Sequence, residues 1–291
     1  MYNMIKLSII VVNWNTVDLT VQALNSVFKE TAGFEYEIIL IDNHSSDASV
    51  EIIKNKFPRV QLIENKENRG FGKANNQGMK IARGEYIFLL NSDTVVLDGA
   101  INKLVAFLDA HPEIVCVGPK LLNRDLTFQH ACRRNLPNPS NAFFHLFGFA
   151  KIFKNSKRAT AYKRFSDNPD KTEPVEAISG AAMMFRKEVF EKTGGFDERF
   201  FFYGEDLDLC KQIQDNGWKI FYVSEAHIIH FGGSSSKKRK TQSLINFYDA
   251  MWIYYQKHFH VNIFFDVVIF LGIKIKLFFS LLVNFFKHTT V

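Results

Sequence analysis

Short apolar segments alternate with longer amphipathic ones along the first 120 residues of this 291-residue chain. Uninterrupted apolar runs of this length are typical of strands buried on both faces of a sheet. The strand–helix alternation predicts an α/β fold with a mainly parallel, Rossmann-like sheet flanked by helices. The predicted strands are Leu7–Val12, Glu37–Ile41, Val60–Ile63, Tyr86–Leu90 and Ile114–Val117, and the predicted helices lie near residues 18–30, 47–57, 72–82 and 98–110.

The alternation stops at residues 121–175, which are rich in Pro, Asn, Lys and Phe. We interpret this stretch as an insertion that is mobile or contacts a substrate. Regular patterns then resume. They predict order at Val175–Phe185, helices near 186–193 and 204–215, a strand at Lys219–Val223, a helix near 241–259 and a last apolar segment from residue 261.

Polar residues follow the predicted strands. The strand Tyr86–Leu90 runs into Asn91-Ser92-Asp93, which puts a lone carboxylate at the sheet edge where open α/β folds bind their ligands. Taken alone, Asn-Ser-Asp is also compatible with a simple polar turn. The interpretation depends on whether other segments converge on the same edge.

Three other polar clusters converge there. Asn13 and Asn15 follow the first strand, Asp42 follows the second, and Asn68-Arg69-Gly70 precedes the third helix. Such groups suit a nucleotide, because an Asp accepts a hydrogen bond from a pyrimidine base, Gly allows close backbone approach and Arg meets a phosphate. The alternatives are turn residues for the two Asn, helix caps for Asp42 and Asp47, and an ordinary loop around the glycine.

The second half of the chain supplies acids and a histidine. Glu205, Asp206 and Asp208 fall in the first turn of a predicted helix, where carboxylates complement the helix dipole. Beside the aromatic residues 200–203, one of them could also act as a general base. His230 precedes a Gly/Ser-rich loop and four basic residues, so it is a candidate for binding a diphosphate and a metal ion, or a structural histidine.

The net charge of +6 is concentrated at the C-terminal end. Residues 231–291 hold eight basic and two acidic residues, which leaves 28 of each in residues 1–230. The main body therefore has no general attraction for polyanions, and we expect no nucleic-acid partner. The three cysteines have no paired spacing, and Leu7–Val12 is too short for a secretory signal, so a cytoplasmic, reducing compartment is expected.

The last apolar segment, residues 263–287, is interrupted by charges too often to predict a membrane-spanning helix. On a helical projection its polar residues gather in a sector of about 80°, which suits a helix lying in the interface of an anionic membrane. The alternative is a helix packed on the domain or on a second subunit, as in a homodimer. The sector contains Asp266, Lys276, Ser280, Asn284 and Lys287.

Taken together, these clusters resemble the family 2 glycosyltransferases, which have the GT-A fold, and within them the bacterial rhamnosyltransferase-type enzymes. The resemblance covers roughly residues 5–235. Its elements are Val11–Asn15, Asp42–Asp47, Asn68–Gly78, Leu89–Asp93, Ser179–Met183, Gly195–Cys210 and His230 with Gly232-Gly233-Ser234.

The resemblance implies an inverting transfer of a sugar from a nucleotide-sugar, with dTDP-rhamnose first and UDP-sugars next, to a glycan or lipid-linked acceptor. It implies Asp206 as the base, with Glu205 as the fallback, and Mg²⁺ or Mn²⁺ held by Asp93 and His230. This chain has Asn91-Ser92-Asp93 where many members have Asp-x-Asp, which leaves one clear carboxylate ligand. The implied donor-binding residues are Asn13, Asn15, Asp42, Asn68, Arg69, Gly70, Asn75, Ser92 and Asp93.

The implied organisation is a glycosyltransferase domain at 1–235, with a nucleotide-binding half (1–120) and an acceptor half (121–235). A basic, apolar helical segment at 236–291 would place the protein at the inner face of the cell membrane. Two other classes of function stay open. One is a non-catalytic nucleotide-sugar- or glycan-binding protein on the same fold. The other is a nucleotidyltransferase, although Val11–Asn15 lacks the Gly-rich, basic signature of that class.

Overall fold

The computed structural model describes residues 4–137, 168–232 and 240–288, with side chains to residue 286. Its first half follows the predicted alternation, and the predicted elements are confirmed to within about two residues, except that the last strand runs to Leu122 and not to Val117. These elements are β1 Leu7–Asn13, α1 Val17–Glu30, β2 Tyr36–Asp42, α2 Ser49–Lys56, β3 Val60–Glu64, α3 Phe71–Ile81, β4 Tyr86–Asn91, α4 Ala100–Ala110 and β6 Ile114–Leu122.

The rest of the described chain adds further strands, one 3-10 helix and four α-helices. The predicted strand at Lys219–Val223 continues to His230, and the three-residue strand β5 was not predicted. These elements are β5 Thr94–Val96, η1 His130–Cys132, β7 Arg133–Arg134, β8 Glu173–Val175, β9 Ala177–Ile178, β10 Ala182–Arg186, α8 Lys187–Thr193, α9 Glu205–Asp215, β11 Lys219–His230, α10 Lys240–His258 and α11 Ile263–His288.

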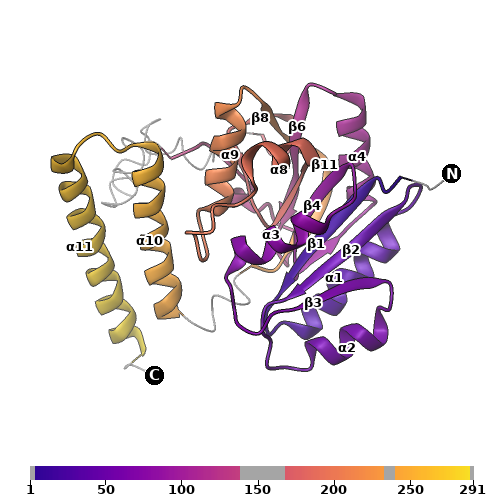
Figure 1. Ribbon diagram of the computed structural model, residues 1–291, viewed down its shortest axis with the longest axis horizontal. Coiled ribbons are helices and arrows are strands. Elements are labelled where there is room, and N and C mark those ends of the chain that lie inside the picture. Colours follow the sequence, from indigo (N-terminus) through magenta and orange to yellow (C-terminus); the bar gives the residue numbers. More distant parts are fainter. Residues whose placement is uncertain (1–3, 138–167, 233–239, 289–291) are drawn as a thin grey trace.

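The main sheet is mixed, with the strand order β3-β2-β1-β4-β10-β6-β11-β5 and β8 beside β11. The pairs among β3, β2, β1 and β4 are parallel, and so is β6 with β11, whereas β10 is antiparallel to both of its neighbours. Helices flank this sheet (Figure 1). The predicted α/β class is therefore confirmed, with an antiparallel strand at the centre that the sequence did not predict.

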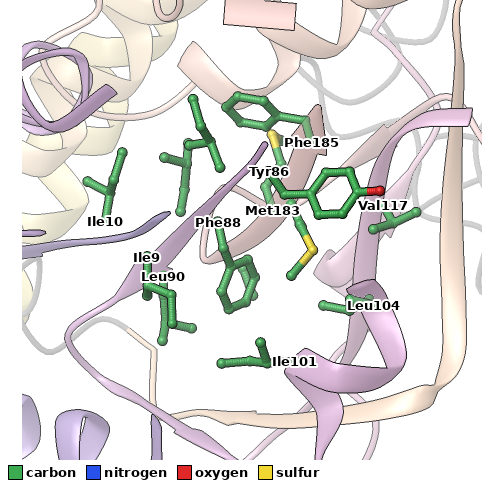
Figure 2. Close-up of a cluster of buried hydrophobic side chains, with 14 of the residues drawn as sticks. Ile9, Ile10, Tyr86, Phe88, Leu90, Ile101, Leu104, Val117, Met183 and Phe185 are labelled. Carbon is green, nitrogen blue, oxygen red and sulfur yellow. The ribbon is translucent and has the colours of Figure 1, made fainter. Parts of the chain in front are cut away.

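The core is built around β4, whose five apolar residues are all buried. Figure 2 shows Phe88 of this strand grouped with Met183 of β10 and Leu104 of α4. Burying a side chain such as Phe88 contributes about 1.5–3 kcal/mol. The fully buried strand thus fixes the position of the polar residues that follow it.

The helices α10 and α11 form an antiparallel pair beside the α/β body, with α10 next to α9 and α11 outermost (Figure 1). The polar sector predicted on α11 faces α10 at three of its positions, Asp266, Ser280 and Asn284. Ser280 Oγ lies 2.8 Å from Tyr248 Oη, Asn284 donates to Thr241 at 3.1 Å, and Asp266 is buried. The predicted interfacial helix, with this sector in water, is therefore wrong in its orientation. Its apolar side is the exposed one.

Among the described residues, neither α11 nor any other helix combines the length and apolar character needed to cross a bilayer. Several predictions concern residues outside the described ranges. They are the centre of the insertion (138–167), the Gly/Ser loop with its basic residues (233–239), the domain boundary at 235, and the side chain of Lys287.

Candidate active site

The carboxyl ends of β1, β2 and β4 meet at one edge of the sheet, as their parallel register requires. Asn13 lies opposite Asp42, and Val12 lies opposite Asn91. The predicted convergence of the first, second and fourth strands is therefore present, and it brings together side chains up to 78 positions apart in the sequence.

Asn13 holds the start of this edge together. Its Nδ2 donates to Asp42 Oδ1 at 2.8 Å and to Ser45 Oγ at 3.0 Å, and its Oδ1 accepts from Thr16 and Thr20 at 2.8 and 2.7 Å. With no exposed surface and every polar atom engaged, Asn13 positions Asp42 and contacts no solvent. Its predicted contact with the nucleotide-sugar stays a prediction, and its role in the structure is to position Asp42.

The Asp42 carboxylate keeps capacity for a ligand. Oδ1 accepts from Asn13, and Oδ2 accepts from the Ser45 backbone N–H at 2.9 Å. A carboxylate has about four lone-pair sites, so two of them are still available for a donor such as a base N–H. Asn15 closes the same loop by accepting from the Ser46 N–H at 2.7 Å.

Asp47 behaves as the predicted helix cap. Its Oδ1 accepts from the Ser49 backbone N–H at 3.1 Å, and its Oδ2 accepts from the Val17 N–H at 3.2 Å. It therefore serves the first residues of both α1 and α2, where backbone N–H groups lack partners within the helix.

The loop before α3 is tied to this edge by Asn43, which the sequence interpretation passed over as a site residue. Asn43 Nδ2 donates to Asn68 Oδ1 at 2.9 Å, and Asn43 Oδ1 accepts from the Arg69 N–H at 3.0 Å. Asn68 in turn accepts from the Gly70 N–H at 3.0 Å. Arg69 itself points outward, and in the described part of the chain its guanidinium forms no ion pair, which leaves it available for a phosphate.

Gly70 is required by a protein contact. Its φ is +81°, and a Cβ there would stand 2.5 Å from the Phe201 carbonyl oxygen, which accepts from the Phe71 N–H at 2.9 Å. The close approach expected for a nucleotide is thus made by the 195–204 segment. Asn75 is buried and donates back to the Phe71 carbonyl, and Asn76 bonds Phe196 through both of its polar atoms.

Asn91-Ser92-Asp93 forms the turn between β4 and β5. The short strand β5 pairs antiparallel with the end of β11, with Thr94 opposite His230. This pairing places His230 Nε2 3.4 Å from Asp93 Oδ1 and 3.4 Å from Asn91 Nδ2. Ser92 Oγ lies 3.0 Å from Thr16 Oγ1, behind the turn. The two predicted metal ligands are therefore neighbours.

The environment of His230 fits a cation at this point. Gln129 Nε2 donates to Asn123 Oδ1, so Gln129 Oε1, 2.8 Å from His230 Nδ1, must accept a proton from the ring. In the neutral imidazole, this leaves the Nε2 lone pair directed at the Asp93 carboxylate. A histidine that binds a metal usually donates its other N–H in this way.

Asn91 adds a third group to this site. Its Oδ1 is buried and accepts no hydrogen bond from the described residues. A carboxylate, an imidazole and an amide oxygen are donors that Mg²⁺ or Mn²⁺ accepts, with diphosphate oxygens and water completing the shell. Among the described residues, no group of three or more His, Cys, Asp or Glu is suited to a metal.

The acids of α9 lie on the other side of the site. Asp206 Oδ2 accepts from Arg134 Nη2 at 2.5 Å and from the Gly180 N–H at 3.1 Å, and Oδ1 accepts from the Leu207 N–H at 2.8 Å. Gly180 leaves room for this contact, because a Cβ there would meet Asp206 Cβ at 3.2 Å. These three contacts fix the orientation of the carboxylate, which retains lone-pair capacity to accept a proton.

Glu205 differs from its neighbour. It is buried, and its Oε2 has no hydrogen-bond partner among the described residues. Burial, and then the charge of Asp206, raise the pKa of Glu205 to about 8. Glu205 is therefore mostly protonated at pH 7 and is the weaker candidate for a base at that pH.

A single turn connects the two sides of the site. The Asn91 N–H at the end of β4 donates to the Ala181 carbonyl at 2.9 Å, and the N–H of the preceding residue, Gly180, donates to Asp206. Asp93 and Asp206 thus belong to one hydrogen-bonded unit.

The cysteines offer no competing nucleophile. Burial raises the pKa of Cys132 to about 11 and the pKa of Cys210 to about 12. Burial also raises the pKa of Cys116.

Three contributors were not identified from the sequence. Asn43 lay within a recognised motif but carries no charge to single it out. Gln129 and Arg134 lie in the 121–175 stretch, where no periodicity or motif marks them. Only the fold shows that they orient His230 and pair with Asp206.

The chain matches two families of known proteins. Residues 8–194 match the family described as "Glycosyl transferase family 2", and residues 160–233 match one described as "N-terminal domain of galactosyltransferase". Among curated relatives, an N-acetylglucosaminyl-diphospho-decaprenol L-rhamnosyltransferase of Mycobacterium tuberculosis is 26% identical over 75% of this chain and 73% of its own length.

Other relatives are longer proteins. The O-antigen biosynthesis protein RfbC of Myxococcus xanthus is 27% identical over 80% of this chain but only 18% of its own length. A poly(ribitol-phosphate) beta-glucosyltransferase of Bacillus spizizenii is 34% identical over 39% of this chain and 19% of its own length.

Two solved structures share the fold at low sequence identity. S. aureus TarS 1-349 superposes with a TM-score of 0.59 at 17% identity, covering 94% of this chain and 71% of that one. GalNAc-T7 with UDP, GalNAc and Mn²⁺ superposes at 0.56 and 18% identity, covering 78% of this chain and 43% of that one. The family match spans well over half of the chain, the fold agrees with GT-A structures, and the chain therefore belongs to glycosyl transferase family 2.

Proposed function

We propose that this glycosyltransferase moves a sugar, with inversion, from a nucleotide-sugar to a hydroxyl of a glycan or lipid-linked acceptor in cell-surface polysaccharide synthesis. The observation that carries the proposal is the Asp206 carboxylate, held on the same 179–181 turn that receives the end of β4. The L-rhamnosyltransferase relative favours dTDP-rhamnose as the donor, with a UDP-sugar as the alternative. The O-antigen and poly(ribitol-phosphate) relatives favour a surface glycan as the product.

In this mechanism Asp206 removes the proton of the acceptor hydroxyl, and that oxygen attacks the anomeric carbon opposite the nucleotide. Asp42 binds the base through its remaining acceptor capacity, and Arg69 meets the diphosphate. The site offers one ionised base and, in the described residues, no second carboxylate placed as a nucleophile. A single displacement, and hence inversion, follows from that arrangement.

Asp93, His230 and Asn91 would hold a divalent cation, Mg²⁺ or Mn²⁺, together with the donor. When bound, such an ion neutralises the charge that develops on the leaving diphosphate. Gln129 fixes the ring of His230 for this task through the Nδ1 hydrogen bond. The Mn²⁺ in the GalNAc-T7 structure supports a metal for this fold.

A lipid-linked acceptor would place the reaction at the inner face of the cell membrane, as the basic and apolar C-terminal segment predicts. The same helices could instead form a homodimer, and that alternative stays a prediction.

Thermal unfolding with a panel of nucleotide-sugars, with and without Mn²⁺, tests the donor and the metal together. A ligand at 100 times its Kd adds about 2.7 kcal/mol of stability. We expect dTDP-rhamnose to raise the melting temperature in the presence of Mn²⁺ and to lose most of this effect in Asp93→Asn. The Asp170→Asn variant is the control, because Asp170 is an exposed acid paired with Lys120. No stabilisation by any nucleotide-sugar would refute the proposal.

A further inference from the structure

The outward side of α11 is a wide apolar surface with no cover among the described residues. Phe264, Ile275, Phe279 and Val283 are 70%, 57%, 58% and 55% exposed. Contiguous exposed apolar surface of this kind marks an interaction site in soluble proteins. We propose that this face of α11 docks in the interfacial layer of an anionic lipid bilayer.

The polar groups of α11 are used by α10, which explains why the apolar side faces out. Asp266 bonds His260 at 2.8 Å, Ser280 lies at hydrogen-bond distance from Tyr248, and Asn284 donates to Thr241. An exposed helix in water would normally turn its apolar stripe inward. The reverse arrangement is stable only if another apolar phase covers the outer side.

The width of the apolar arc separates a lipid phase from a second protein chain. At 100° per residue, the exposed positions run from Phe270 to Val283 around about 220° of the helix. A helix seam with a partner copy covers a narrower stripe, so a dimer would leave much of this arc in water. A fluid hydrocarbon layer covers the whole arc.

The charges in and beside the arc identify the lipid as anionic. Lys276 falls about 20° beyond one edge of the arc and Lys274 lies within it near the other edge, and such long side chains reach the headgroup level. Lys274 pairs with Asp249, and Lys276 forms no ion pair in the described part of the chain. The one acid of α11, Asp266, is buried against α10, so the outward charges are all positive.

The docked helix would be rigidly connected to the site. Lys257 and His258 of α10 bind Asp208 of α9 at 2.9 and 2.7 Å, two residues from Asp206. Lipid docking would therefore hold Asp206 at a fixed height above the bilayer. This consequence rests on the proposed function, whereas docking itself does not.

Co-sedimentation of the full chain with vesicles tests the proposal. The vesicles are phosphatidylcholine alone or with 30% phosphatidylglycerol, and we expect binding to the anionic vesicles that weakens with added salt. Phe279→Glu should reduce that binding at least about tenfold. It removes an aromatic side chain that the bilayer would bury, and it adds a negative charge that the anionic lipid repels. Lys276→Gln should reduce it about fivefold on anionic vesicles only.

Leu126→Glu, which also replaces an exposed apolar side chain by glutamate but at a 61% exposed site outside α11, is the matched control and should bind like the wild type. Val283→Glu provides a second α11 variant, with unfolding curves checking that each variant is folded. Three results would overturn the proposal. They are no binding by the wild type, an equal loss in Leu126→Glu, or a wild-type dimer that Phe279→Glu converts to a monomer without any vesicle binding. None of these measurements needs transferase activity, so they fail or succeed independently of the proposed reaction.

Discussion

The two sides of the candidate site use polar residues in opposite ways. At the sheet edge, Asn13 and Asn43 bury their amides and use both polar atoms in hydrogen bonds to neighbouring loops. At the start of α9, Glu205 leaves one buried oxygen without a partner in the described residues, and Asp206 depends on a guanidinium and two backbone N–H groups. The first side is preorganised for binding. On the second side, burial and the neighbouring charge of Asp206 raise the pKa of Glu205.

The difference extends to what supports each side. The sheet edge is held by loops that follow strands buried in the main core. The α9 side is also held by α10, through Lys257 and His258 on Asp208 and through Ala250 against Phe200. We therefore expect variants on the two sides to separate binding from proton transfer.

The largest effect on stability is expected from Asp208→Asn. Asp208 has no exposed surface and binds both Lys257 and His258, so removing its charge leaves the Lys257 ammonium with Asp197 alone and His258 beside a neutral amide. Breaking such a pair costs roughly 3–5 kcal/mol. Denaturant unfolding should show this loss.

The control for this variant is Asp197→Asn, which removes the other carboxylate of Lys257 but leaves the link to α9 intact. It should lower the free energy of unfolding clearly less than Asp208→Asn does. Equal losses for the two variants would show that α10 does not specifically hold α9.

A smaller effect is expected from Asn13→Ala at the sheet edge. The change removes one buried hydrogen-bond partner from each of Asp42, Thr16 and Thr20, at a cost of about 1–3 kcal/mol. Because Asn13 positions Asp42, nucleotide affinity should fall while turnover at saturating donor is retained. Calorimetric titration and steady-state kinetics measure these two quantities, and Asn216→Ala, an exposed amide at the end of α9, is the control. A turnover loss with unchanged affinity would contradict the division between the two sides.

The smallest expected effect is on the pH dependence of the free energy of unfolding. The folded-state pKa of Glu205 is raised to about 8, above its usual 4.5, so the folded protein retains a proton that the unfolded chain releases. The stability contributed by this group is therefore present at acid pH and falls as pH rises from about 4.5 to about 8. Glu205→Gln removes this dependence.

Measured against the wild type, the Gln variant should gain about 1.4 kcal/mol in relative stability between pH 6 and pH 7. Unfolding free energies at a series of pH values test this. Parallel curves for the two proteins would mean that Glu205 is ionised throughout.

The sequence predicted the sheet edge better than the α9 side, for a physical reason. Parallel register brings Asn13, Asp42 and Asn91 to one edge whenever their strands are identified, and buried strands are marked by apolar runs. Arg134 reaches Asp206 through tertiary contacts that no local pattern encodes. The three-residue strand β5, which brings Asp93 to His230, is too short to leave a periodic signal.

The orientation of α11 shows the same limit. Its polar sector at Asp266, Ser280 and Asn284 was visible in the sequence, but periodicity cannot tell which medium each face meets. The hydrogen bonds to α10 decide it, and they depend on where a second helix packs.

The most direct test of the account is the turnover of Asp206→Asn compared with its affinity for the donor. The account predicts a loss of 10²–10⁴-fold in kcat, on the order expected for a general base, with donor affinity close to that of the wild type. Asp215→Asn, at the exposed end of the same helix, should keep both values. A folded Asp206→Asn protein that retains wild-type turnover would contradict the central claim that this carboxylate takes the acceptor proton.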